Sequence, residues 1–120
     1  MKLNELINED LIKLELEASN KKDAIRELID ILQQAGKVSN RKKFEKAVFN
    51  REKEGTTGIG YGVAIPHGKS KGVKETSLVF GRKKDGIDFE SLDGDTAKIF
   101  FMIAVPEKSD STHLNVLSRL

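Results

Sequence analysis

The segment GIGYGVAIPHGKS, residues 58–70, contains His67, one of the two histidines in this 120-residue chain. A neutral imidazole is a good nucleophile, and its ordinary pKa of about 6.5 leaves it mostly unprotonated near neutral pH. His67 could therefore accept a phosphoryl group, whose charge of roughly −1.5 to −2 needs cationic and N–H donors around it. The alternative is that His67 is a turn residue or a hydrogen-bonded strut without chemistry.

Suitable donors are present elsewhere in the chain. The guanidinium of Arg51 can bind phosphoryl oxygens in a bidentate manner, and Gly58, Gly60 and Gly62 allow a backbone to approach an anion closely. His113 stands near the predicted start of a helix, where backbone N–H groups favour anions. Plainer explanations exist for both side chains. Arg51 can simply complement a helix dipole, and His113 can be the neighbour of a helix cap.

A nucleotide-binding loop explains the glycines less well. The pattern G-x-x-x-x-G-K-[ST] requires a glycine at position 63, where this chain has Val63. Pro66 also removes a backbone N–H from the interior of such a loop. The alternating glycines do not fit the dinucleotide pattern G-x-G-x-x-G either. We therefore expect no cofactor, and the two histidines lack the spacing of metal ligands.

Composition excludes several classes of protein. The chain has no cysteine, which rules out disulfides, thiolate nucleophiles and zinc–thiolate sites. Charged residues make up 33% of the chain but nearly balance, with a formal net charge of +2, so no nucleic-acid partner is expected. No apolar run approaches the roughly 18 residues of a membrane span, and no signal-peptide pattern is seen. We expect one cytoplasmic domain.

Hydrophobic periodicity predicts the elements that position these residues. The N-terminal half is predicted to contain a half-buried strand in LIKLELE with Ile12, Leu14 and Leu16 inward, a helix from Ser19 or Asn20 to Gly36, and a helix from Ser39 or Asn40 to Arg51. After the glycine-rich stretch, we predict strands at Ser77–Phe80 and around Ile87–Phe89, a central strand at 98–105 buried on both faces, and a helix opening near STHLNVLSRL.

Strands and helices alternate along the chain, so the predicted fold class is α/β. The last predicted helix begins only about eight residues before the sequence stops. A helix of that length is marginal on its own. We therefore expect the C-terminal helices to be truncated.

The sequence REKEGTTGIGYGVAIPHGKS resembles the active-site signature of the enzyme IIA domains of the sugar phosphotransferase system, in the fructose/mannitol class (type 2). The resemblance continues through GIDFESLDGDTAKIFFMIAVPEKSDSTHLNVLSRL. It implies a mixed sheet with helices on both faces and one type-2 domain over 1–120, incomplete at its C-terminus. By resemblance, His67 in AIPH is the phosphoryl acceptor, and Arg51 and His113 in THL are the supporting active-site residues. Tyr61 departs from many relatives, which have asparagine there.

The resemblance implies a phosphohistidine relay. A histidine-containing phosphocarrier protein would donate the phosphoryl group to Nε2 of His67, and a cysteine of a IIB domain would accept it for sugar uptake, with fructose-type sugars favoured. The membrane would be involved only indirectly, through the IIC component. Two alternatives remain open. One is a regulatory IIA domain, nitrogen-related or fused to a regulator, and the other is an interaction domain that has lost its activity.

Overall fold

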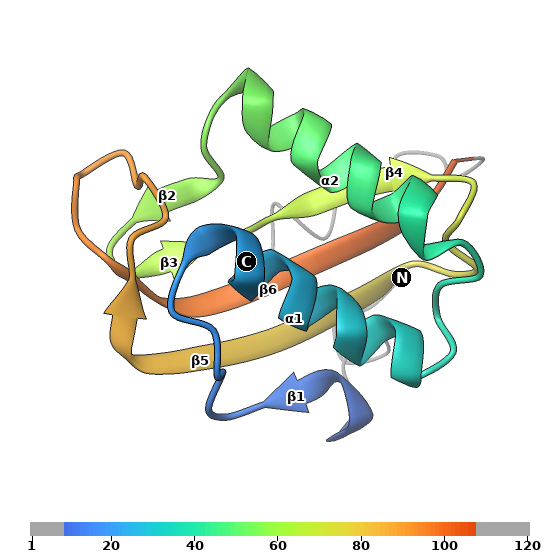
Figure 1. Cartoon of the computed structure of the whole chain (residues 1–120), viewed down its shortest axis with the longest axis horizontal. Coiled ribbons are helices and arrows are strands. Elements are labelled where there is room, and N and C mark those ends of the chain that lie inside the picture. Colours follow the sequence, from blue (N-terminus) through green and yellow to red (C-terminus); the bar gives the residue numbers. More distant parts are fainter. Residues whose placement is uncertain (1–8, 108–120) are drawn as a thin grey trace.

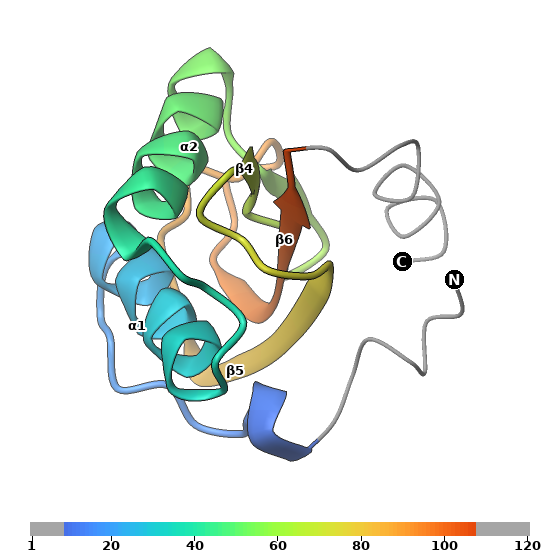
Figure 2. The ribbon, with the colours of Figure 1, turned by 90° about the vertical axis from the view of Figure 1, so that its right-hand side faces the viewer.

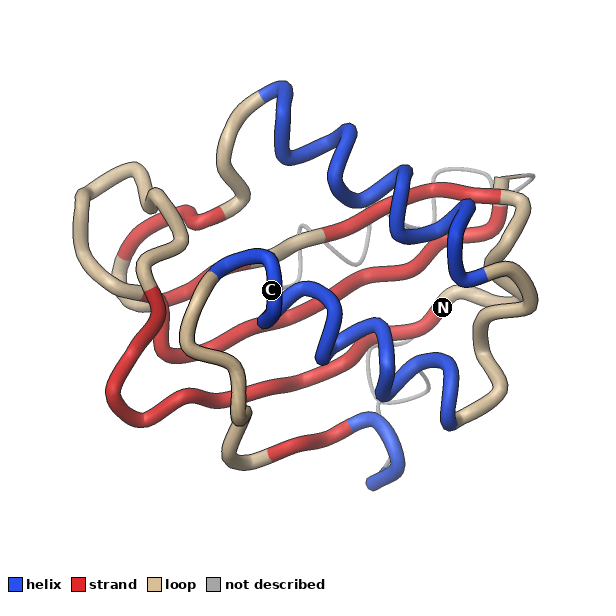
Figure 3. Tube along the Cα trace, viewed as in Figure 1, coloured by secondary structure: helices blue, strands red, loops and turns tan. Residues whose placement is uncertain are grey.

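The computed structural model of the chain describes residues 9–107. Its elements are, in chain order, the short 3-10 helix η2 (Glu9–Leu11), β1 (Ile12–Lys13), α1 (Lys21–Gln34), α2 (Arg41–Glu54), β2 (Gly58–Gly60), β3 (Val63–Ala64), β4 (His67–Ser70), β5 (Ser77–Ile87) and β6 (Ala97–Pro106). Figure 3 shows the strands as one layer beneath the two helices.

The strands form one mixed sheet with the order β1-β5-β6-β3-β2, and β4 pairs with β6 as well. The central strand β6 is antiparallel to β5 on one side and parallel to β3 and β4 on the other (Figure 1). The predicted strand at 98–105 is confirmed in its place. Its burial on both faces holds for residues 102–105, whereas Lys98 is exposed and Ile99 and Phe101 are half-buried.

Both helices lie on the same face of the sheet, α1 over β5 and α2 over β4 (Figures 1 and 2). Each begins at an asparagine cap as predicted, because Asn20 accepts the backbone N–H of Asp23 and Asn40 accepts that of Lys43. Their apolar stripes form the core with the facing strand residues: Ala24, Ile25, Leu28, Ile29, Leu32, Phe44, Val48, Val79, Phe100, Met102 and Ala104.

The α/β class and the mixed sheet are confirmed. The expectation of helices on the second face concerns the helix near STHLNVLSRL, which lies outside the described residues. The second helix ends at Glu54, three residues beyond the predicted end at Arg51.

Two strand predictions need correction. The first strand covers only Ile12 and Lys13, and Leu16 is buried while Leu14 and Ile12 are exposed. Regular pairing with β5 ends at Lys13, and beyond it the N–H of Leu16 still donates to the carbonyl of Arg82 at 2.8 Å, so the alternation in LIKLELE does not continue as a regular strand.

The other correction concerns β5, which continues from Ser77 to Ile87 rather than ending at Phe80. Its register against β6 shifts between Arg82 and Ile87. Gly86 lies in this irregular part with a φ of +82°, and a Cβ there would be 2.4 Å from Oγ1 of Thr96. Because the sequence GRKKDG is charged and contains glycines, hydrophobic periodicity did not predict that the strand continues.

Candidate active site

His67 is the first residue of β4 and faces away from the two helices. Its neighbour Gly68 faces α2, since a Cβ on Gly68 would lie 3.0 Å from Cγ2 of Val48. Side chains alternate across a strand, so the His67 ring lies on the opposite face, in register with Ile103 of β6. Its side chain is half-buried.

A backbone carbonyl holds the ring of His67. Nδ1 lies 2.9 Å from the carbonyl oxygen of Ile65. Because a carbonyl oxygen can only accept, Nδ1 must carry the proton in this contact. In the neutral ring, Nε2 is then the unprotonated nitrogen and has the lone pair that a nucleophile needs. The geometry therefore assigns nucleophilic character to Nε2.

The Ile65 carbonyl is available because Ile65 points away from β6, toward the outer edge of the strand. β3 and β4 follow one register along β6, since Ala64 pairs with Phe100 and His67 with Ile103. Pro66 has no N–H to donate to β6, so the ladder of hydrogen bonds is interrupted between β3 and β4. The carbonyl of Pro66 still accepts the N–H of Ile103. Ile65 faces the other edge, where its N–H binds the carbonyl of Thr57 at 3.0 Å.

The three candidate glycines do not form a loose loop. Gly58 and Gly60 belong to β2, and Gly62 follows Tyr61 in the two-residue turn to β3. Tyr61 and Gly62 have φ values of +58° and +78°, the pattern of a type I′ hairpin turn. At Gly58 a Cβ would lie 2.5 Å from Oγ of Ser91, so this glycine allows the 88–96 loop to pack closely.

Asp93 fixes the same turn from the 88–96 loop. Its carboxylate accepts the backbone N–H of Tyr61 at 3.0 Å and that of Asp95 at 3.1 Å. The hydrogen bond from Tyr61, followed by that from Asp95, lowers the pKa of Asp93 below its ordinary value. The sequence analysis missed Asp93, because it acts through a contact 32 residues away with no local pattern.

Arg51 lies in the last turn of α2, the helix that packs on β4. Its guanidinium donates to the carbonyl of Gly55 at 2.8 Å. Within residues 9–107, the structure shows no hydrogen bond between Arg51 and His67. The third predicted residue, His113, lies outside the described residues.

Two other features of residues 9–107 bear on function. They contain no group of three or more histidine, cysteine, aspartate or glutamate side chains arranged to hold a metal ion. None of their helices is long and apolar enough to cross a membrane.

The chain is similar to proteins of a known family. The family model described as "Phosphoenolpyruvate-dependent sugar phosphotransferase system, EIIA 2" matches residues 5–120. The chain is 47% identical over 120 residues to the PTS system fructose-specific EIIABC component of Bacillus subtilis. The alignment covers all of this chain but only 19% of that longer protein.

Solved structures agree with this match. The nitrogen regulatory protein IIA-Ntr from Neisseria meningitidis superposes with a TM-score of 0.83 at 34% identity, covering 98% of this chain and 80% of that one. Enzyme IIA for mannitol from Escherichia coli, solved in complex with phosphorylated enzyme IIB, has a TM-score of 0.78 at 28% identity. That superposition covers 93% of this chain and 76% of that one.

The fold and the family match define a phosphotransferase component of the IIA type. The chain belongs to the EIIA 2 family of the phosphoenolpyruvate-dependent sugar phosphotransferase system. The resemblance stated from the sequence is thereby confirmed.

Proposed function

We propose that this chain is a phosphohistidine carrier with His67 as its phosphoryl acceptor. The observation that carries the proposal is the contact between Nδ1 of His67 and the carbonyl of Ile65, which leaves the Nε2 lone pair available for attack. The histidine lies in the AIPH segment of a family whose members are phosphotransferase components.

In the proposed reaction, Nε2 of His67 attacks the phosphorus carried by a histidine of the phosphocarrier protein. A new P–N bond forms on His67 as the P–N bond on the donor breaks, and the donor imidazole leaves with the electron pair. The transition state is loose, so positioning and charge stabilisation account for most of the catalysis. Arg51 and His113 are proposed to stabilise the charge on the transferring group.

The phosphoryl group is proposed to pass next to a cysteine thiolate of a IIB domain. This chain has no cysteine, so the acceptor is on another domain or polypeptide. The complex of the mannitol IIA structure with phosphorylated enzyme IIB supports this kind of partner. The fructose-specific relative at 47% identity supports a fructose-type sugar and, with it, a cytoplasmic place for the domain.

A regulatory role is the second candidate, because the Neisseria structure that superposes at a TM-score of 0.83 is a nitrogen regulatory protein. The chemistry at His67 would be the same in both roles. The acceptor distinguishes them. Transfer of phosphate to a fructose IIB domain supports transport, and phosphorylated protein that no IIB domain discharges supports regulation.

The direct test is phosphorylation with phosphoenolpyruvate, enzyme I and the phosphocarrier protein. We expect one acid-labile, base-stable phosphoryl group per chain, and none on the His67→Gln variant. His113→Gln is the matched control and should still be labelled at His67. Labelling of the His67→Gln variant would refute the assignment.

A further inference from the structure

Glu52 is connected to the ring of His67 by a series of hydrogen bonds that pass through the backbones of two residues, Thr57 and Ile65. Its carboxylate accepts the backbone N–H of Thr57 at 3.2 Å and also the Thr57 hydroxyl. The carbonyl of Thr57 accepts the N–H of Ile65 at 3.0 Å. The carbonyl of Ile65 in turn accepts Nδ1–H of His67 at 2.9 Å.

The far end of this series is firmly anchored. The Nζ of Lys21, at the first position of α1, lies 2.9 Å from Oε2 of Glu52. The same ammonium lies 4.9 Å from the centroid of the Phe89 ring and 3.2 Å from Oε1 of Glu90. The Glu52 side chain is only 6% exposed. A carboxylate this buried needs all of these partners, because burying an unpaired charge is costly.

The series meets the chain at a residue that points away from β6. Ile65 lies between β3 and β4, and its N–H goes to the carbonyl of Thr57 rather than to β6. Its N–H and its carbonyl depend on the edge contacts instead. Thr57 supplies the first of these, and Thr57 is itself 2% exposed and held by Glu52 through two hydrogen bonds.

We propose that Glu52 is a positioning residue for His67, acting through Thr57 and Ile65 to hold the imidazole in its Nδ1–H tautomer with Nε2 toward the phosphoryl donor. The catalytic consequence rests on the function proposed above, whereas the tautomer does not. Free histidine favours the opposite tautomer, with the proton on Nε2. A protein that uses Nε2 as nucleophile therefore has to impose the Nδ1–H form, and the Ile65 carbonyl does so only when correctly placed.

Both the tautomer and the rate can be measured on the whole chain. We compare wild type with Glu52→Gln, whose amide has one acceptor oxygen for the two Thr57 donors and presents N–H groups to the Lys21 ammonium. Nitrogen-15 NMR of the His67 ring, assigned by its absence in the His67→Gln variant, reports the tautomer. The matched control is Glu54→Gln, which makes the same charge change at an exposed position of the same helix end.

We expect wild type and Glu54→Gln to show the Nδ1–H tautomer alone, and Glu52→Gln to show a mixture of the two. We expect phosphoryl acceptance by Glu52→Gln to slow by about 10- to 100-fold, with the KM for the donor protein unchanged. A Glu52→Gln variant that keeps the pure Nδ1–H tautomer and the wild-type rate would overturn the proposal.

A second pair of variants keeps the proposal testable if Glu52→Gln does not fold. Thr57→Val removes only the hydroxyl and leaves the Glu52–Lys21 ion pair in place, and Thr57→Ser restores a hydroxyl. Tautomer mixing in Thr57→Val that Thr57→Ser reverses supports the series, and an unchanged tautomer in Thr57→Val contradicts it. If wild type is not phosphorylated at all, the proposed function fails, but the tautomer measurement still decides the role of Glu52.

Discussion

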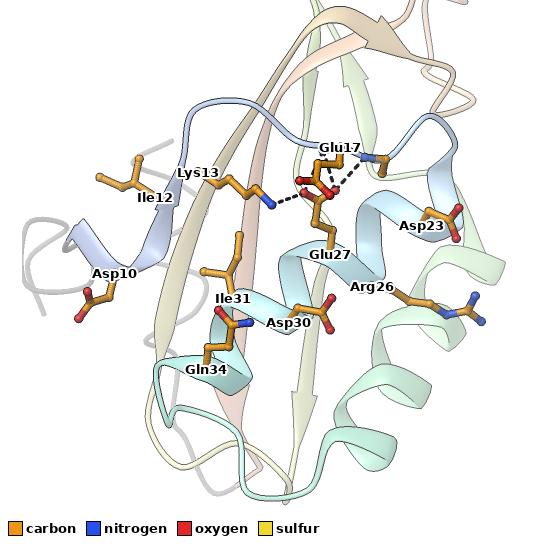
Figure 4. A pocket seen from close by; sticks show the side chains of 11 residues that line it. Asp10, Ile12, Lys13, Glu17, Asp23, Arg26, Glu27, Asp30, Ile31 and Gln34 are labelled. Atoms are coloured by element: carbon orange, nitrogen blue, oxygen red, sulfur yellow. Dashed lines mark hydrogen bonds and ion pairs between the residues drawn. The ribbon is translucent and has the colours of Figure 1, made fainter.

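Removing the carboxylate of Glu27 should destabilise the fold substantially. This side chain, on α1, connects the segment before the helix to the helix itself (Figure 4). Its oxygens accept the backbone N–H of Glu17 at 3.0 and 3.1 Å, that of Ala18 at 2.9 Å, and Nζ of Lys13 at 2.7 Å. The perturbation is Glu27→Ala, which removes every one of these contacts at once.

The size of the effect follows from these contacts. A hydrogen bond to a charged group contributes about 1.5–3 kcal/mol when it is protected from water. The Glu27 side chain is 13% exposed, but Lys13 is far more accessible, so the ion pair adds at most about 1 kcal/mol. Water can reach part of the Glu17 segment and replace some of the lost bonds. We therefore expect Glu27→Ala to lower the free energy of unfolding by about 2–3 kcal/mol.

The loss should depend on pH. Burial alone would raise the pKa of Glu27, but the hydrogen bonds from Lys13, Glu17 and Ala18 together with the Lys13 charge bring the pKa below its ordinary value of 4.5. A carboxyl whose pKa is lower in the folded than in the unfolded chain stabilises the fold above the unfolded pKa. That contribution disappears as the pH falls through the folded pKa. The difference between wild type and variant should therefore be constant above about pH 6 and shrink below about pH 4.5.

Urea unfolding of both proteins between pH 7 and pH 3.5 measures this difference. At pH 7 the melting temperature of Glu27→Ala should fall by about 10–20 °C for a domain of this size. Glu45→Gln is the control. Glu45 pairs with Arg26 and Arg41 at the surface, so this substitution should lower the free energy of unfolding by no more than about 1 kcal/mol. A Glu27→Ala variant no less stable than Glu45→Gln at pH 7, or equally destabilised at pH 3.5, would refute the reasoning.

Three further predictions concern the site. Tyr61→Asn should raise the free energy of unfolding by up to about 1 kcal/mol in urea titrations. Asn tolerates the positive φ, and removing the tyrosine, which is 97% exposed, loses no packing. An unchanged midpoint would contradict this. Gly68→Ala should lower the free energy of unfolding by about 1–3 kcal/mol and slow phosphorylation of His67, because its Cβ would lie 3.2 Å from the backbone nitrogen of Val48. A variant as stable as wild type would contradict this. Arg51→Lys should slow transfer in rapid-quench assays by one to a few powers of ten, on the order of the loss of one electrostatic stabiliser; an unchanged rate would exclude Arg51 from the site.

The elements that sequence periodicity predicts well are those whose apolar residues meet one core. The stripe of α1 and the caps Asn20 and Asn40 are local features, and local physics determines them. The apolar run of β6 similarly reflects its central place between β5 and the β3–β4 line. Each of these predictions needed only neighbouring residues.

The elements that periodicity missed depend on distant partners. Residues 81–86 of β5 are mostly polar and contain two glycines, yet the strand continues, because Gly81, Arg82 and, after an irregular stretch, Ile87 pair with β6. Position 81 has little room for a side chain, since a Cβ on Gly81 would lie 2.9 Å from Cδ2 of Leu28. Conversely, LIKLELE has a strand-like alternation, but its regular pairing with β5 ends at Lys13. No local pattern encodes either outcome.

The residues of the candidate site likewise fall into those that their own segment predicts and those that depend on distant partners. The proposed phosphoryl acceptor His67 stands out from its own segment, whereas the groups proposed to set its tautomer are backbone atoms and a glutamate fifteen positions earlier. The Ile65 carbonyl can bind Nδ1 because Ile65 points away from β6, toward the outer edge of the strand. Pro66 acts on the other edge. It has no N–H to donate to β6, so the pairing is interrupted between Ala64 and His67, while its carbonyl still accepts the N–H of Ile103. The support for the ring therefore comes from the alternation of the strand, which places the Ile65 carbonyl on the same edge as the Ile65 N–H contact with Thr57.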